Sequence, residues 1–167
     1  DCVRAALSVD TYDAEANYLD GLLLAQAGET ATALDRLGLA AYDPRFRSAA
    51  LAYAARLELG RGSWAEAERL AAKSLVANGL NLDALAVQVI AARKRGDAAR
   101  AKRLAVAALE RVPLAPLFRF ELELLGEGSA DALVRNEFPE KTWTELGSWY
   151  ETCGLFDEAL GLYERAC

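Results

Sequence analysis

The side chains that could do chemistry in this 167-residue chain are carboxylates, because the sequence contains no histidine. A serine or cysteine nucleophile activated by an imidazole base is therefore excluded. The best carboxylate cluster is Glu121, Glu123 and Glu127. A glycosidase needs two carboxylates on opposite sides of a cleft, whereas these three follow one another along a short segment. We therefore expect no catalytic residue, and we expect the chain not to be an enzyme.

Metal and cofactor sites are not expected either. The three cysteines, Cys2, Cys153 and Cys167, are far apart and form no C-x-x-C pair. They favour reduced thiols in a cytoplasmic protein over a zinc site or a disulfide framework. The sequence has no phosphate-binding loop and no complete dinucleotide-binding glycine motif, so no cofactor is expected. The net charge of -6 argues against nucleic acid, and the uncharged runs are too short to cross a membrane.

Small residues recur with a fixed period. Three glycines lie 34 residues apart, and an alanine follows each of them after five residues. These residues are Gly28, Gly62 and Gly96, with Ala33, Ala67 and Ala101. The composition is rich in alanine and leucine, and aromatic residues make up only 8% of the chain. This period in such a sequence predicts pairs of antiparallel helices that stack into a solenoid.

The last repeat carries eight residues at positions that are typical of one family. They are Trp143, Leu146, Gly147, Tyr150, Gly154, Ala159, Tyr163 and Ala166. Together with the periodic glycines and alanines, they make the chain resemble tetratricopeptide repeats (TPR). The resemblance implies an all-α fold, a TPR-like superhelix of antiparallel helix pairs with a concave groove. In such a fold, glycine ends the first helix of each repeat, and small residues let the two helices approach closely.

The repeat register divides the chain, which we expect to be a single TPR-like helical domain over residues 1–167. Residues 1–11 are expected to be the end of a truncated repeat, and residues 14–47, 48–81 and 82–113 to be three repeats. Residues 114–139 break the period and are expected to form an irregular helical pair over 117–125 and 129–137. The first of these segments also alternates like a strand. Residues 140–167 are expected to be a final, truncated repeat.

The first helix of each repeat lines the concave groove in the TPR fold. The resemblance therefore assigns seven residues to a peptide-binding groove: Tyr18, Leu22, Tyr53, Arg56, Ile90, Arg93 and Lys94. The surface is apolar at its N-terminal end and gains basic residues further along. It suits a helix or an extended peptide. We therefore expect a protein–protein or domain–domain interaction scaffold, whose partner is a protein, a peptide or another domain of the same polypeptide.

Charge is distributed unevenly along the C-terminal half. Residues 82–113 carry seven basic and three acidic side chains, and residues 114–167 carry four basic and eleven acidic ones. One interpretation is a basic patch for an acidic partner beside an acidic patch. The other is that these charges lie on the solvated outer faces of helices.

A second resemblance is carried by residues 135–150 (RNEFPEKTWTELGSWY) and 42–51 (YDPRFRSAAL). These runs are similar to long bacterial TPR proteins that have a large β-rich, carbohydrate-enzyme-like domain before the repeats. This resemblance implies an alternative function. The chain would be an accessory helical module of a large bacterial carbohydrate-active enzyme, whose catalytic domain lies outside residues 1–167.

Overall fold

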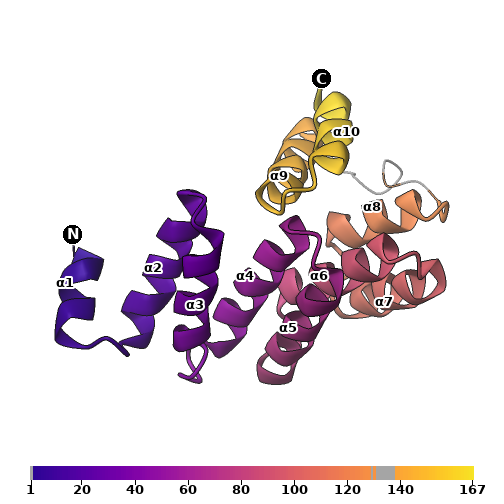
Figure 1. Ribbon diagram of the computed structural model, residues 1–167. Coiled ribbons are helices and arrows are strands. Elements are labelled where there is room, and N and C mark those ends of the chain that lie inside the picture. The colour runs from indigo at the N-terminus through magenta and orange to yellow at the C-terminus, as the bar shows by residue number, and fades with distance from the viewer. Residues whose placement is uncertain (1, 129, 131–137) are drawn as a thin grey trace.

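The computed structural model describes residues 2–128, 130 and 138–167, and the secondary structure of these residues is entirely helical. Figure 1 shows the helices arranged as a row of antiparallel pairs with one pair set apart. The helices are α1 (Cys2–Val9), α2 (Ala14–Gln26), α3 (Thr30–Ala40), α4 (Arg47–Gly60), α5 (Trp64–Ala77), α6 (Leu82–Lys94), α7 (Ala98–Arg111), α8 (Pro116–Leu124), α9 (Pro139–Thr152) and α10 (Phe156–Ala166).

Helices α2 to α7 form three pairs, each packed against the next along the row. Each pair occupies one period of the sequence repeat. The segment expected as a helix over 117–125 is α8, so its alternating pattern does not make a strand. The short helix expected over 129–137 lies outside the described residues, apart from the buried Ala130.

The periodic glycines do what the repeat predicts. Gly28, Gly62, Gly96 and Gly154 have φ angles of 82°, 76°, 82° and 70°, in the left-handed region that favours glycine. After the first of them, the Glu29 amide donates to the Leu24 carbonyl and the Gly28 amide to the Ala25 carbonyl. This pattern closes a helix and turns the chain sharply into the second helix of the pair.

Small residues bring the two helices of a pair into close contact. The alanines five residues after the turn glycines, Ala33, Ala67, Ala101 and Ala159, are all buried. On the facing helix, a methyl group at Gly147 would lie 2.7 Å from the Tyr163 ring. The last pair, α9 and α10, therefore packs internally like a TPR hairpin.

That last pair, the C-terminal hairpin, does not simply extend the row. Figure 1 shows it beside the ends of α4, α6 and α8. One core cluster joins Leu59 of α4, Ile90 of α6 and Phe120 of α8 to Trp143 and Tyr150 of the hairpin. The hairpin thus lies across the first helices of several pairs, which are the helices that line the concave side.

The backbone of the hairpin comes close to the row at Gly60, the last residue of α4. A Cβ atom on Gly60 would lie 2.8 Å from the carbonyl oxygen of Cys153 and 3.7 Å from the Cα atom of Gly154. Both neighbours are backbone atoms in the turn of the hairpin. Glycine at this position is therefore a condition of docking.

We predict that Gly60→Ala lowers the free energy of unfolding by about 1–3 kcal/mol, because the new methyl group overlaps backbone that has little room to move. Alanine is otherwise the better helix former. Gly38→Ala in α3, where no atom lies within 4 Å of the new Cβ, is the matched control. It should gain about 0.5–1 kcal/mol. Urea denaturation measures both, and a gain for Gly60→Ala would contradict the docking.

Candidate functional site

The residues assigned to the groove divide into an open and a covered part. Tyr18 and Leu22 lie on α2, and Tyr53 on α4, and all three are half-buried. We call these three residues the open surface. The rings of Tyr18 and Phe46 stack with their centroids 5.6 Å apart. Neither the Tyr18 nor the Tyr53 hydroxyl makes a hydrogen bond within the described part of the chain, so both remain available to a partner.

The two tyrosines share an electrostatic environment with the middle of the groove. Burial raises the pKa of Tyr18, and the neighbouring Tyr53 and the carboxylate of Asp83 raise it further against the opposing charge of Arg56. Asp83 belongs to α6, so these residues approach one another across three successive first helices. Tyr18 therefore stays a neutral hydrogen-bonding phenol at physiological pH.

Arg56 on α4 marks the boundary of the open surface. Its guanidinium lies between two rings, 5.2 Å from the centroid of Tyr53 and 5.3 Å from that of Trp149 in the hairpin. It pairs with Asp83 at 3.3 Å and donates to the hydroxyl of Thr152. The indole N–H of Trp149 donates to the other carboxylate oxygen of Asp83 at 2.8 Å. Arg56 thus connects α4 to both α6 and the hairpin.

The structure does not place Ile90 on an open groove. Ile90 and Leu59 are fully buried, and they share a core cluster with Trp143, Leu146 and Tyr150 of the hairpin. The helix register is the expected one, but the hairpin covers this stretch of the concave side. At Ile90 the hairpin of the same chain therefore shares the core that the assigned groove residue enters.

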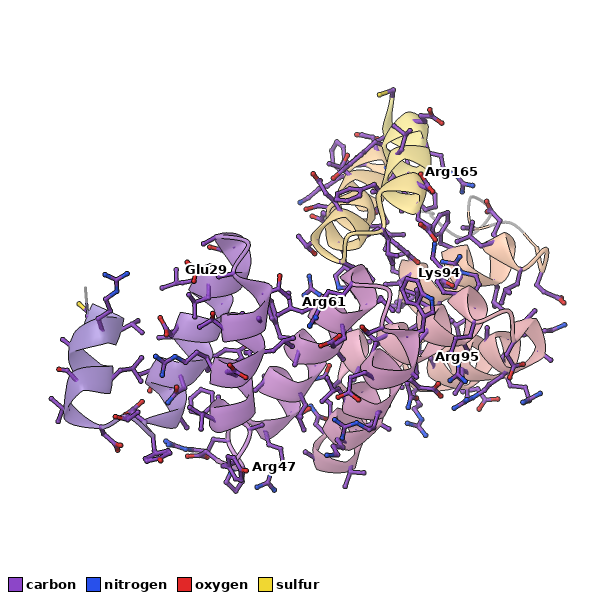
Figure 2. All side chains as sticks on the ribbon, in the orientation of Figure 1. Glu29, Arg47, Arg61, Lys94, Arg95 and Arg165 are labelled. Atoms are coloured by element: carbon purple, nitrogen blue, oxygen red, sulfur yellow. The ribbon has the colours of Figure 1, made fainter. Side chains whose placement is uncertain are left out.

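Arg93 and Lys94 are likewise engaged within the chain. Arg93 Nε lies 2.7 Å from Glu121 Oε2, and Arg93 Nη2 lies 3.0 Å from Glu121 Oε1 and 2.9 Å from Glu158 Oε1. Lys94 Nζ lies 2.6 Å from Glu158 Oε1. Tyr150 Oη donates to Glu121 Oε1 at 2.6 Å. These five residues, the charged cluster, join α6 and α8 to both helices of the hairpin, and Lys94 lies at this junction in Figure 2.

The ionisation of the charged cluster follows from its contacts. Burial opposes the charge of Glu158, but hydrogen bonds from Lys94 and Arg93 outweigh it and lower the pKa of Glu158. Burial likewise opposes the charge of Arg93, yet its bonds to Glu121 and Glu158 raise the pKa of Arg93. Burial and the charge of Glu121 raise the pKa of Tyr150. Arg93 and Glu158 are therefore charged at neutral pH, and Tyr150 is a neutral donor.

The three carboxylates singled out in the sequence have separate cationic partners. Glu121 is fully buried in the charged cluster. Glu123 pairs with Arg165 of α10, and Glu127 with Lys102 of α7 at 2.5 Å. They do not face one another across a cleft, so this arrangement is not that of a glycosidase acid and nucleophile.

Sequence reasoning missed the hairpin residues that cover the groove, Trp149, Thr152 and Glu158. The uneven distribution of charge between residues 82–113 and 114–167 was the signal that could have indicated them. Basic Arg93 and Lys94 belong to the cation-rich stretch and meet acidic Glu121 and Glu158 from the anion-rich one. Part of the charge asymmetry is therefore balanced by ion pairs within the chain. Arg95 and Arg100 both pair with Glu68 on the neighbouring α5.

A cavity of about 730 Å³ lies where the row and the hairpin meet. Its walls come from the start of α6, the α7–α8 connection and α9, with Phe118 and Trp149 among the lining residues.

Cys153 is buried, and burial raises the pKa of its thiol to about 11. Residues 2–128, 130 and 138–167 hold no group of three or more acidic or cysteine side chains placed to bind a metal ion. No helix among these residues is long and apolar enough to span a bilayer.

Solved structures share this architecture. A tetratricopeptide repeat protein from Parabacteroides merdae ATCC 43184 matches with a TM-score of 0.68 at 18% identity, over 98% of this chain and 68% of that one. The fold is a TPR superhelix. MamA matches this chain with a TM-score of 0.61 at 15% identity, over 98% of this chain and 82% of that one. The structure MamA MSR-1 C2 gives 0.54 at 22%, over 92% and 94%. No protein-family model and no curated protein matches the sequence.

We predict that Glu158→Gln weakens hairpin docking in a pH-dependent way. The pKa of Glu158 is lower in the folded state, so its contribution is present above the unfolded-state pKa of about 4.3 and is lost as pH falls through the folded value. At pH 7 the substitution should cost about 1–3 kcal/mol. The cost should shrink below about pH 4.

Glu164→Gln, an exposed residue of the same helix, is the control and should change stability by less than about 0.5 kcal/mol. Urea titrations at several pH values provide the measurement. An equal cost of Glu158→Gln at pH 3 and pH 7 would refute the assigned ion pairs.

Proposed function

We propose that this chain is a non-catalytic interaction scaffold that binds a protein or peptide segment through its open surface, Tyr18, Leu22 and Tyr53. One observation carries the proposal. Two half-buried phenol rings on the concave side have hydroxyls without hydrogen bonds in the described part of the chain. Such rings offer a partner a large apolar contact together with a polar group, which is why tyrosine is common at binding sites.

The position of the open surface supports the same function. It lies on the first helices of two neighbouring pairs, α2 and α4, and the hairpin contacts α4 at Arg56 and Gly60. Leu22 adds an aliphatic side chain on the same helix as Tyr18. A concave apolar surface with a few polar groups accommodates a helix or an extended segment. A segment of another domain of the same polypeptide would be bound in the same way.

The assigned groove is shorter than the seven residues placed there from the sequence. Ile90 is buried, and Arg93 and Lys94 are paired with Glu121 and Glu158. Charge reversal at Arg93 would therefore disturb hairpin docking as well as the groove. The open surface can be tested without that complication through its tyrosines. The alternative of an accessory module of a bacterial carbohydrate-active enzyme stays a prediction from the resemblance of residues 135–150.

We predict that peptides selected on this chain from a displayed library of random dodecamers bind through the open surface. Tyr18→Ala and Tyr53→Ala should each weaken the selected peptides about ten-fold, because each removes a ring from the contact. Tyr42→Ala removes an exposed ring from the α3–α4 connection and should leave the affinity unchanged. Fluorescence anisotropy measures the affinities, and circular dichroism checks that each variant is folded.

If the library yields no binder, or if Tyr18→Ala and Tyr53→Ala leave every selected peptide unaffected, the open surface is not the binding site. Loss of binding in Tyr42→Ala would move the site to the α3–α4 connection.

A further inference from the structure

The concave side beneath the hairpin has the composition of a recognition surface. We call Arg56, Leu59, Ile90, Arg93 and Lys94 the covered surface. Leu59 and Ile90 are fully buried, and their core cluster includes Trp143, Leu146 and Tyr150 of the hairpin, more than fifty positions away in the sequence. In a regular solenoid such concave positions face solvent or a ligand. The hairpin therefore occupies the place of a ligand.

The charges on the two sides of this contact are complementary. Apart from the separate pair of Glu123 on α8 with Arg165 of the hairpin, the row contributes three cations, Arg56, Arg93 and Lys94, and two carboxylates, Asp83 and Glu121. This leaves one positive charge on the row. The hairpin supplies the missing negative charge as Glu158, which lies within 3 Å of nitrogen atoms of both Arg93 and Lys94.

The aromatic contacts of the hairpin are equally specific. Trp149 places its ring against the Arg56 guanidinium and its indole N–H on Asp83. Tyr150 donates to the buried Glu121. A cation on an aromatic face and a phenol on a buried carboxylate both depend on geometry. The row therefore selects a helical hairpin that combines aromatic rings on one helix with a carboxylate on the other.

We propose that the covered surface is a binding site for an acidic helical hairpin that carries aromatic side chains, and that the chain's own C-terminal hairpin is its built-in occupant. A partner hairpin of this chemistry competes with the C-terminal hairpin for Arg56, Arg93 and Lys94. Opening would extend the binding surface from Tyr18 to Lys94. This regulation rests on the proposed function, because it concerns the same concave side.

Tethering explains why the hairpin prevails when no partner is present. A segment joined to its site by a short connection acts at an effective concentration of roughly millimolar. A free peptide of the same affinity at micromolar concentration cannot displace it. Weakening the docking of the hairpin should therefore expose the site to free peptide.

The test uses the full chain and a labelled synthetic peptide of residues 139–167 under reducing conditions. Two variants release the hairpin by independent means. Glu158→Lys places a third cation beside Arg93 and Lys94, and Gly60→Ala disturbs the backbone contact without changing a charge. Glu164→Lys, on the exposed side of the same helix, is the matched control. Amide hydrogen exchange reports whether α9 and α10 lose protection while α2–α7 keep it.

We expect both release variants to bind the peptide at least ten-fold more tightly than the wild-type chain and Glu164→Lys. A peptide with Glu158→Lys should bind at least ten-fold more weakly than the native peptide to the Gly60→Ala chain. Retained protection of α9 and α10 in both variants would overturn the proposal, because these contacts would then not hold the hairpin. Release of the hairpin without tighter peptide binding would overturn it as well.

The open surface is measured separately in the same experiment. Dodecamers that depend on Tyr18 and Tyr53 should bind the wild-type and released chains alike. If they bind and the 139–167 peptide does not, the covered surface fails as a binding site and the proposed function stands. If the dodecamers fail and the 139–167 peptide binds, the open surface fails as a binding site and the covered surface stands.

Discussion

The arrangement of the C-terminal half depends on one buried ion pair, between Arg93 and Glu121. Glu121 is fully buried on α8, and a carboxylate in that position is costly unless its oxygens are satisfied. Two nitrogens of Arg93 and the hydroxyl of Tyr150 satisfy them. Arg93 in turn needs a second acceptor, which Glu158 provides. The pair therefore fixes the positions of α6 and α8 relative to each other. It also binds both helices of the hairpin, because α9 supplies the phenol that donates to Glu121 and α10 supplies the carboxylate that accepts from Arg93.

The N-terminal half follows a different principle. There the contacts are between neighbouring helices and depend on small residues, such as Gly21 on α2, where a methyl group would lie 2.8 Å from the side chain of Leu37. Such contacts repeat with the sequence period and leave the concave side uncovered. As a result the open surface keeps Tyr18 and Tyr53 partly accessible, whereas the covered surface is built into a core. The same face of one superhelix thus has two environments.

The helices and their pairing could be predicted from the sequence because they depend on local features. Gly28, Gly62 and Gly96 adopt the left-handed backbone that glycine tolerates without strain, and the alanines five residues later allow close packing. The hairpin fold of α9 and α10 was predictable for the same reason. Its place on the row was not. The contacts that decide it join Arg93 to Glu158 and Arg56 to Thr152, which are 65 and 96 positions apart. The sequence period does not encode such contacts. Ile90 could therefore be assigned to the concave face, but the hairpin that packs there could not be predicted.

The backbone contact of the hairpin with Gly60 has a consequence for how the chain unfolds. Repeats that touch only their neighbours can open one at a time from an end, and stability is then a sum of local terms. Here α9 and α10 are tied to α4, α6 and α8 together, so these elements cannot open independently without first losing the hairpin. Because the hairpin contacts several pairs at once, the helices from α4 onward should unfold as one cooperative unit and not repeat by repeat. The first pair, α2 and α3, remains outside it and is free to fray on its own.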